Sequence, residues 1–304
     1  RNEMLEFEPD LIVGLGGGSA MDAAKAMWIF YEHPELTQME DILPPNEFPK
    51  LRGKARMCCI PSTSGTASEV SRSIVISDNE KGLKHGVGNM EMMPDIAICD
   101  PEVTMSMPAK ITAETGMDAL THALEALASN RANYLSDILA SQAAQDIMET
   151  LPTAYENGND IKARETMVQA SMVAGIAFTN VSLGIVHSMA HALGAVYDTP
   201  HGVANAILLP TVMEYNADAT GDKYKYIAKA MGVEGVEDMT QEEYRKAAVL
   251  SGGEDQQMSL FGSCAADDII GTLSDMQLDT MTPMDAMNAL YDLQMRAKLR
   301  KGKK

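Results

Sequence analysis

Half of the six histidines in the chain lie within one short, mostly apolar segment. His187 and His191 are four residues apart in GIVHSMAHALG, and His201 follows a break at Thr199 and Pro200. Side chains four positions apart on a helix share one face. Because neutral imidazole is a preferred ligand of Zn(II) and Fe(II), the segment predicts a site for a divalent metal ion.

A second segment, GMDALTHALEA, offers partners for these histidines. It places Asp118 and His122 four residues apart on a predicted helix. Two helices could then aim a carboxylate oxygen and several imidazole nitrogens at one point, which is a ligand set that iron or zinc accepts. The alternative is a group of histidines that only hydrogen-bond within a helical core. The paired spacing favours the metal site, although spacing alone leaves open which four residues bind.

The elements that must position such a site begin with a strand, a glycine turn and a helix. LIVGLG is a short apolar run that predicts a buried strand, and residues 20–33 have apolar side chains at helical spacing. Between them stand Gly16, Gly17, Gly18 and Ser19. Backbone N–H groups at a helix N-terminus bind phosphate, and missing side chains allow close approach. The turn lacks the GxGxxG spacing, so a plain turn is the alternative to a pyrophosphate site.

A second loop, rich in hydroxyl side chains, follows the next predicted strand. The strand is RMCCIP, and the loop PSTSGTASE carries Ser62, Thr63, Ser64, Thr66 and Ser68. Loops that follow neighbouring parallel strands lie side by side at the carboxyl edge of the sheet. We therefore expect the hydroxyl loop to lie beside the glycine turn, which strengthens the case for a phosphate site.

The remaining pattern divides the chain into an α/β part and a helical part. SIVIS and DIAICD are strand candidates rich in Val and Ile, and strand signals fade from residue 107 onward. Helical patterns then cover residues 113–128, 135–151, 161–178 and 185–196. We predict a partial dinucleotide-binding α/β domain with a mostly parallel sheet at residues 1–108, followed by an all-α metal-binding domain at residues 109–248.

Composition narrows the range of functions. The 304 residues carry a formal net charge of −19, which argues against nucleic-acid binding by the main body and suits small ligands. No apolar run reaches the roughly 18 residues of a membrane span, and no secretory signal pattern is present. The four cysteines show no ligand spacing, so we expect reduced thiols in a cytoplasmic protein.

Four segments resemble the iron-containing (group III) alcohol dehydrogenases. They are GGGSAMDAAK, PSTSGTASE, GMDALTHALEA and VHSMAHALGAVYDTPHGVANAILLP, and the similarity covers most of residues 9–248. The resemblance implies that the divalent metal, Fe²⁺ or Zn²⁺, is bound by Asp118, His122, His187 and His201. It places His191 near the metal, at the substrate or nicotinamide, and a proton relay by His191 is our hypothesis for its catalytic role.

The same resemblance implies a cofactor, NAD or NADP. The pyrophosphate-binding turn matches Gly16, Gly17, Gly18 and Ser19, and the second cofactor loop matches Ser62, Thr63 and Thr66. Lys84 matches a cofactor-contacting lysine, with a solvated surface lysine as the alternative. The implied reaction is hydride transfer between a small alcohol and NAD(P), with the metal as a Lewis acid.

Other enzymes on the same fold are an alternative within this resemblance. Glycerol dehydrogenases and dehydroquinate synthases share the architecture but have different metal ligands. The aspartate of DALTHA and the TPHG motif favour the alcohol dehydrogenases. We also predict a homo-oligomer.

Both ends of the chain depart from the family pattern. The chain starts almost at the strand before GGGS, so we expect an N-terminal truncation. Residues 249–304 predict a flexible linker and a helix at 282–298 that resembles the extreme C-terminus of bacterial MutS-type mismatch-repair proteins. The QMSLF segment at 257–261 resembles a motif that docks on the replication sliding clamp. The alternative function is therefore an inactive, chimeric remnant whose tail binds a replication or repair partner.

Overall fold

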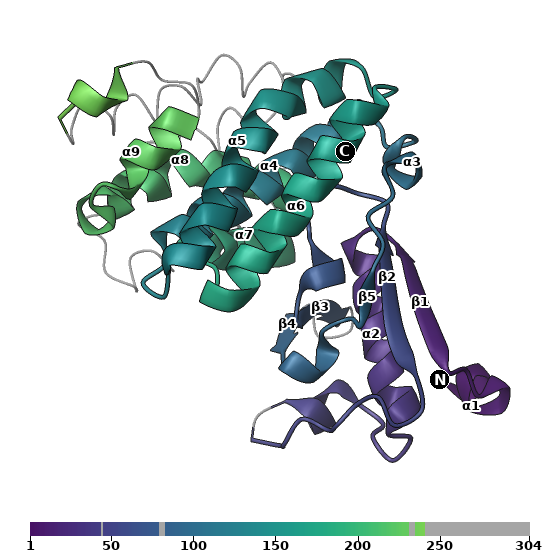
Figure 1. The fold of residues 1–304 in the computed structure, drawn as a ribbon. Helices are drawn as coiled ribbons and strands as arrows, with labels where there is room; N and C mark the ends of the chain where they lie inside the picture. The colour runs from purple at the N-terminus through teal and green to yellow at the C-terminus, as the bar shows by residue number, and fades with distance from the viewer. Residues whose placement is uncertain (44, 79–82, 231–234, 241–304) are drawn as a thin grey trace, which may run out of the picture.

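A computed structural model describes residues 1–43, 45–78, 83–230 and 235–240 of the chain (Figure 1). The linker, the helix at 282–298 and the QMSLF segment predicted from the sequence lie outside these residues. In Figure 1 the α/β part lies below a bundle of helices, and the chain passes from one to the other near α3 (Pro101–Thr104).

A three-stranded parallel sheet forms the centre of the α/β part. Its strands are β1 (Leu11–Gly16), β2 (Arg56–Pro61) and β5 (Ile96–Ala97), in the order β1-β2-β5. Helix α2 (Gly18–Glu32) follows β1 directly and shares a buried core with the sheet, which includes Met21, Ala24, Trp28, Ile29, Met57 and Cys59. This arrangement confirms the predicted α/β fold with a small parallel sheet.

Strand β1 is less buried than the sequence predicted. Its side chains alternate, and Leu11, Val13 and Leu15 are 45%, 51% and 58% exposed, whereas Ile12 faces the core. The expectation of a buried strand was therefore wrong for one face, because β1 lies at the edge of the sheet formed by the described residues and α2 covers only its other face. An apolar run alone does not distinguish a strand covered on both faces from one covered on a single face.

Strands β3 (Ser73–Asp78) and β4 (Leu83–Gly88) form a separate antiparallel hairpin. Ile74 pairs with Val87, and α2 packs against β3. Lys25 of α2 is fully buried there and donates hydrogen bonds to the carbonyl oxygens of Ser71 (2.7 Å) and Ser73 (3.3 Å). The hairpin is thus anchored to the helix that follows the glycine turn.

The helical part consists of helices that pack against one another. They are α4 (Ala109–Ala128), α5 (Tyr134–Glu156), α6 (Ile161–Val181), α7 (Ile185–Tyr197), α8 (His201–Thr220) and α9 (Lys223–Ala230). Capping residues set two of the starts, because Asn133 and Asp160 accept hydrogen bonds from the first free N–H groups of α5 and α6. The shorter elements are α1 (Asn2–Phe7), η1 (Met39–Ile42), η2 (Ser68–Val70), η3 (Met90–Met92) and η4 (Val236–Asp238).

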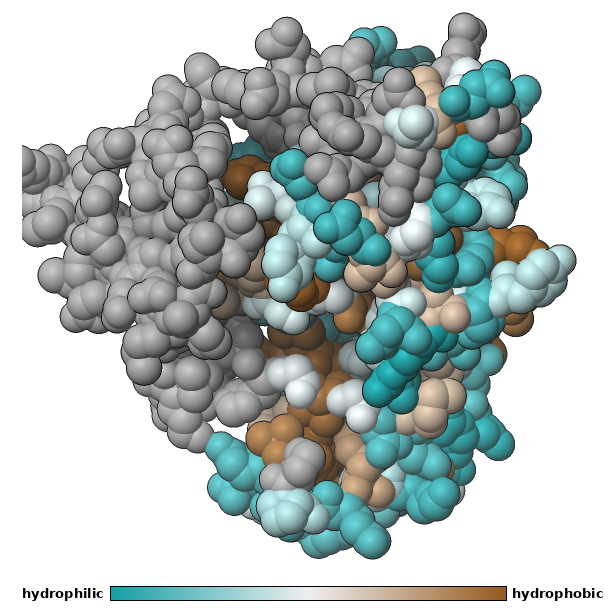
Figure 2. Space-filling view, turned by 90° about the vertical axis from the view of Figure 1, so that its left-hand side faces the viewer, coloured by the Kyte–Doolittle hydropathy of each residue, from teal (hydrophilic) through white to brown (hydrophobic). Residues whose placement is uncertain are grey.

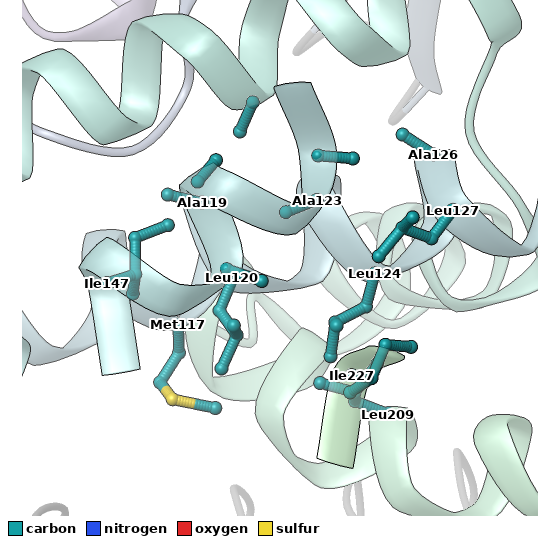
Figure 3. Close-up of a cluster of buried hydrophobic side chains, with 14 of the residues drawn as sticks. Met117, Ala119, Leu120, Ala123, Leu124, Ala126, Leu127, Ile147, Leu209 and Ile227 are labelled. Carbon is teal, nitrogen blue, oxygen red and sulfur yellow. The ribbon is translucent and has the colours of Figure 1, made fainter. Parts of the chain in front are cut away.

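Helix α4 lies at the centre of the bundle and is buried on almost every side from residue 112 to residue 127. Figure 3 shows Leu124 pointing toward Leu209 of α8 and Ile227 of α9. The alanines of α4, including Ala119 and Ala123, lie on another side of the helix, and their small size allows close packing. The polar side chains of α4 must therefore find partners within the protein.

On the face shown in Figure 2, a strip of hydrophobic residues lies beside mostly hydrophilic ones. No single helix among the described residues has the length and hydropathy needed to cross a membrane. Within the described ranges one pair of helices, α6 and α7, reaches that length and hydropathy when taken together, and the two are bent by 104° relative to each other.

Candidate metal and cofactor site

One face of α4 carries three side chains that can ionise or bind metal. Asp118, His122 and Glu125 are separated by four and three residues, so they lie along the same side of the helix. All three are buried, with 4%, 4% and 6% of their surface exposed. A buried polar group is costly without a partner, so this face requires charged or hydrogen-bonding neighbours.

His187 of α7 supplies the first of these neighbours and bridges two carboxylates. Its Nε2 lies 3.3 Å from Asp118 Oδ1, and its Nδ1 lies 2.6 Å from Glu125 Oε2. The other oxygen of Glu125 accepts a hydrogen bond from the backbone N–H of Val186 at 2.7 Å. Glu125 therefore fixes both the start of α7 and the ring of His187.

His201, the first residue of α8, completes a group of three donors. Its Nε2 lies 3.5 Å from Asp118 Oδ1. One ligand atom each from Asp118, His187 and His201 lies within 4.8 Å of the others, which makes this group a candidate metal site. In a tetrahedral zinc site with bonds of about 2.0–2.2 Å, ligand atoms are about 3.3–3.6 Å apart. The oxygen–nitrogen distances of 3.3 Å and 3.5 Å fit that geometry.

His122 lies at the margin of this group. Its Nε2 is 3.8 Å from Asp118 Oδ1, while its Nδ1 is 3.2 Å from the carbonyl oxygen of Gly65. Donation to Gly65 leaves Nε2 as the nitrogen facing Asp118. The rings of His122 and His187 stack with centroids 4.4 Å apart. Its direction is suitable for a fourth ligand, although it is not one of the three grouped donors.

His191 lies one turn further along α7 and outside the donor group. The centroid of its ring is 6.2 Å from that of His187. The ring itself stacks on the ring of His201, with the two centroids 5.0 Å apart. The spacing of four residues therefore does not make His187 and His191 paired ligands in this structure. His191 instead lines the open cleft in front of the donors.

The protonation states of the candidate metal ligands follow from their burial and from their contacts. Burial lowers the pKa of His122 to about 4, so its imidazole is neutral, as a ligand must be. Burial opposes the charged form of Asp118, but the surrounding imidazoles, His122 first, outweigh it and hold the Asp118 pKa well below its usual range. Burial also opposes a charged His187, yet its hydrogen bonds to Asp118 and Glu125 raise its pKa to about 9. A metal ion that takes His187 Nε2 at neutral pH would displace a proton from it.

Two residues that contact the candidate metal ligands were not predicted from the sequence. Glu125 orients His187, and Asn205 of α8 donates from Nδ2 to Asp118 Oδ1 at 2.7 Å. Their spacing contained a usable signal, because Glu125 lies seven residues after Asp118 and Asn205 lies four after His201. Both offsets return to the same helix face.

The glycine turn and the hydroxyl loop lie side by side at the carboxyl ends of β1 and β2, as expected. Gly16 pairs with Pro61, and its carbonyl oxygen accepts a hydrogen bond from Ser62 N at 2.9 Å. Gly16 has a φ of +148°, a conformation that favours glycine. A Cβ on Gly18 would come within 2.7 Å of the Thr66 methyl group, so the two loops touch only because residue 18 lacks a side chain.

This junction leaves polar atoms available for a ligand. The hydroxyl oxygens of Thr63 and Ser64 are buried and have no hydrogen-bond partner among the described residues. Ser19 and Thr66 line the adjoining cleft together with Gly18, the first residue of α2, where backbone N–H groups have no partner within the helix. Orphaned hydroxyls beside a helix N-terminus fit a phosphate group. Lys84 lies on β4 opposite Ser77, and its strand neighbours Gly86 to Gly88 line the cleft.

A single cleft joins this phosphate-type site to the metal donors. Its volume is about 530 Å³, and its walls include Gly18 and Ser19 at the turn and Asp118, His187 and His201 at the donors. That volume lies within the range of small-molecule and cofactor sites. The arrangement allows an extended ligand to place a phosphate at α2 and its other end beside the metal donors.

Buried Glu69, just beyond the hydroxyl loop, gives the α/β part a pH dependence. It is 2% exposed, and burial raises its pKa to about 7 against the weaker opposing effects of its own backbone and of Lys25. The folded state therefore binds more protons than the unfolded state between pH 4.5 and 7, and stability falls as the pH rises through that window. We expect Glu69→Gln to flatten this slope and to raise the free energy of unfolding at pH 8 by at most about 3 kcal/mol.

Urea unfolding of the metal-free protein at several pH values checks this prediction. Glu149→Gln, on the exposed side of α5, is the matched control and should keep the parental slope. An unchanged slope in Glu69→Gln would contradict the prediction.

Comparison with known proteins decides the family. The sequence profile described as "Iron-containing alcohol dehydrogenase" matches residues 2–101, and "Fe-containing alcohol dehydrogenase family, C-terminal" matches residues 112–295. The chain belongs to the iron-containing alcohol dehydrogenase family. The second match includes most of the segment 249–304, for which the MutS-like interpretation stays a prediction.

Individual relatives within the family include dehydrogenases of small alcohols. The chain is 50% identical over 232 residues to the NADPH-dependent butanol dehydrogenase of Clostridium saccharobutylicum, and 44% identical over 232 residues to a 1-propanol dehydrogenase of Salmonella typhimurium. Each alignment covers 76% of this chain, and 59% and 58% of the relatives. The chain thus spans less than two thirds of the length of these curated relatives.

Solved structures agree with the fold. A 1,3-propanediol oxidoreductase superposes with a TM-score of 0.80 at 37% identity, over 89% of this chain and 69% of that chain. An alcohol dehydrogenase from Oenococcus oeni gives a TM-score of 0.81 at 31% identity, over 99% of this chain and 73% of that one. The family fold, an α/β part followed by an all-helical part, is therefore shared across the described residues.

Proposed function

We propose that the protein is a metal-dependent alcohol dehydrogenase, or aldehyde reductase in the reverse direction, that transfers hydride between a small alcohol and NAD(P). The observation that carries this proposal is the single cleft that joins the glycine turn of α2 to the donors on α4, α7 and α8. A phosphate-type site alone or a metal site alone would fit many reactions. Their connection within one cleft suits a metal ion and a dinucleotide that act on the same substrate.

The proposed ligands of the metal ion are Asp118, His122, His187 and His201. When bound, a divalent ion supplies a Lewis acid for the substrate oxygen, and a nicotinamide supplies the hydride acceptor. The protein itself orients the donors, since Glu125 holds His187 through Nδ1 and the Gly65 carbonyl holds His122 through Nδ1. The same residues accept iron or zinc.

The cofactor and the proton complete the proposed site. We assign the pyrophosphate to Gly16, Gly17, Gly18 and Ser19, with Ser62, Thr63, Thr66 and Lys84 as further cofactor residues. His191 lines the cleft beside His201, a position from which it could exchange a proton with bound substrate. Either dinucleotide fits this proposal, since the butanol dehydrogenase is described as NADPH-dependent and a related sulfoacetaldehyde reductase is described in complex with NAD+.

The substrate class is a small alcohol or aldehyde. Phe178 and Leu183 give the cleft an apolar wall near the donors, which suits a short carbon chain. The names of the relatives, a butanol and a 1-propanol dehydrogenase, support the same class. A cytoplasmic location, a homo-oligomeric state and a sliding-clamp contact through residues 257–261 stay predictions.

Metal content tests the proposal first. We expect the anaerobically purified chain to contain close to one Fe or Zn per chain by elemental mass spectrometry, and His187→Ala to lose that metal. Aldehyde reduction with NADH and NADPH should fall about a thousandfold in the variant, since Lewis-acid stabilisation is worth several kcal/mol.

His33→Ala is the matched control for this experiment. His33 lies at the end of α2, where it contacts Glu35 and the carbonyl oxygen of Lys50, so metal and activity should be retained. Equal metal content in His187→Ala and the parent, or metal without any cofactor-dependent activity on short alcohols and aldehydes, would refute the proposed function.

A further inference from the structure

Asn205 lies where the three candidate metal ligands Asp118, His187 and His201 come together. It is fully buried on α8, and its Nδ2 is 2.7 Å from Asp118 Oδ1. The same nitrogen is 3.3 Å from His187 Nε2 and 3.3 Å from His201 Nε2. One amide group therefore contacts a donor atom from each of the helices α4, α7 and α8.

The oxygen of this amide has no partner in the part of the chain that the structure describes. Asn205 Oδ1 is buried and has no hydrogen bond among the described residues. A fully buried amide with one unsatisfied oxygen costs stability, because that oxygen has given up its water. If this position served packing alone, leucine would stabilise the protein more, because it has a similar volume and no polar atom. We therefore attribute the role of the amide to its shortest contact, the hydrogen bond to Asp118.

That hydrogen bond constrains the carboxylate. Asp118 is the one candidate ligand that approaches all three histidines, since the Nε2 atoms of His122, His187 and His201 lie within 4.0 Å of its Oδ1. A ligand in a metal site must be held in direction, and outer partners commonly do so. Asn205 holds the carboxylate from α8, the helix that also carries His201, so the contact also sets the distance between α4 and the start of α8.

We propose that Asn205 is a positioning residue of the metal centre, which holds Asp118 Oδ1 between His187 and His201 and thereby sets the affinity and the geometry of the bound ion. The inference rests on the proposed function, because it requires that a divalent ion binds at these donors. It adds to the four proposed ligands a neutral amide that acts through one of them.

Cobalt binding provides the test, because Co²⁺ accepts zinc-type ligands and its visible absorption reports ligand geometry. We expect Asn205→Ala and Asn205→Leu to weaken Co²⁺ binding 10- to 100-fold, as measured by competition with a chelator. The visible bands of the Co²⁺ complex should also shift in position and intensity. The thermal midpoint of the metal-free protein should stay near the parental value, because the leucine variant preserves the packed volume.

Asn180→Ala is the matched control. Asn180 lies on the exposed side of α6, and its Nδ2 donates to the Ile176 carbonyl oxygen, away from the donors. It should bind Co²⁺ with parental affinity and spectrum. Parental affinity and an unchanged spectrum in both Asn205 variants would overturn the inference alone. Loss of the fold in both variants would also overturn it, since Asn205 would then act in folding. A parent chain without Co²⁺ binding would overturn the proposed function and the inference together.

Discussion

Gly202→Ala is expected to abolish binding of the metal ion. Gly202 follows His201 in the first turn of α8, where the helix lies directly against the backbone of α4. An added Cβ would overlap the carbonyl group of Glu114, with its carbonyl carbon at 2.5 Å and its Cα at 2.9 Å. Backbone cannot swing away as a side chain does, so α8 must move and take His201 with it.

The effect should appear in both metal affinity and stability. We expect at least a hundredfold loss of Co²⁺ or Zn²⁺ affinity, because a displacement of His201 breaks its 3.5 Å approach to Asp118. Overpacking should also lower the free energy of unfolding by roughly 1–3 kcal/mol. Gly86→Ala is the control, since a Cβ on Gly86 meets nothing within 4 Å. Parental metal affinity in Gly202→Ala would show that α8 does not depend on this contact.

Among the substitutions predicted for this protein, Arg164→Met is expected to lower the free energy of unfolding the most. Arg164 is fully buried on α6, and burial lowers the pKa of its guanidinium. Its nitrogens donate to the Gly158 carbonyl at 2.9 Å, to Thr112 Oγ1 at 2.8 Å and to the Met107 carbonyl at 2.9 Å. The side chain thus ties the start of α6 to the first turn of α4 and to the segment that leads into it.

Methionine fills much of the same volume but donates nothing. The acceptors at Met107 and Thr112 would stay buried without this donor, and each such group costs about 1–3 kcal/mol. We expect a loss of roughly 3–5 kcal/mol and a fall in the thermal midpoint of about 10 °C, measured by circular dichroism. Arg131→Met, at an exposed arginine between α4 and α5, should change the midpoint little. A midpoint within 2 °C of the parent in Arg164→Met would contradict the role given to this side chain.

Local patterns in the sequence predicted the parts of the site that lie close together along the chain. The strand, glycine turn and helix around Gly16 form a continuous segment, and the histidines of α7 and α8 are separated by fourteen residues at most. The spacing of Asp118 and His122 indicated a second pair of candidate ligands, and the resemblance to alcohol dehydrogenases then implied which four residues form the set. Each of these residues belongs to a recognisable motif.

Contacts between distant helices were harder to predict. Glu125 and Asn205 acquire their roles only when α4 meets α7 and α8. Their spacing from Asp118 and His201 indicates a shared helix face, but it does not indicate which side chains that face meets. The hairpin partner β4, LKHGVG, carries little intrinsic strand preference and is fixed by pairing with β3. The exposure of β1 likewise depends on what covers each face of the sheet, which a run of apolar residues does not reveal.

The unequal burial of the donors has a consequence for how an ion would enter and leave. Asp118, His122 and His187 have side chains only 4–6% exposed, whereas His201 is 34% exposed at the very first position of its helix. Helix ends open locally at far lower cost than the centre of a bundle. Release of the ion would then begin with the detachment of His201, while the α4 donors stay fixed to the most deeply packed helix. The exchange rate would thus follow the fraying of one helix terminus, independently of the global stability of the protein.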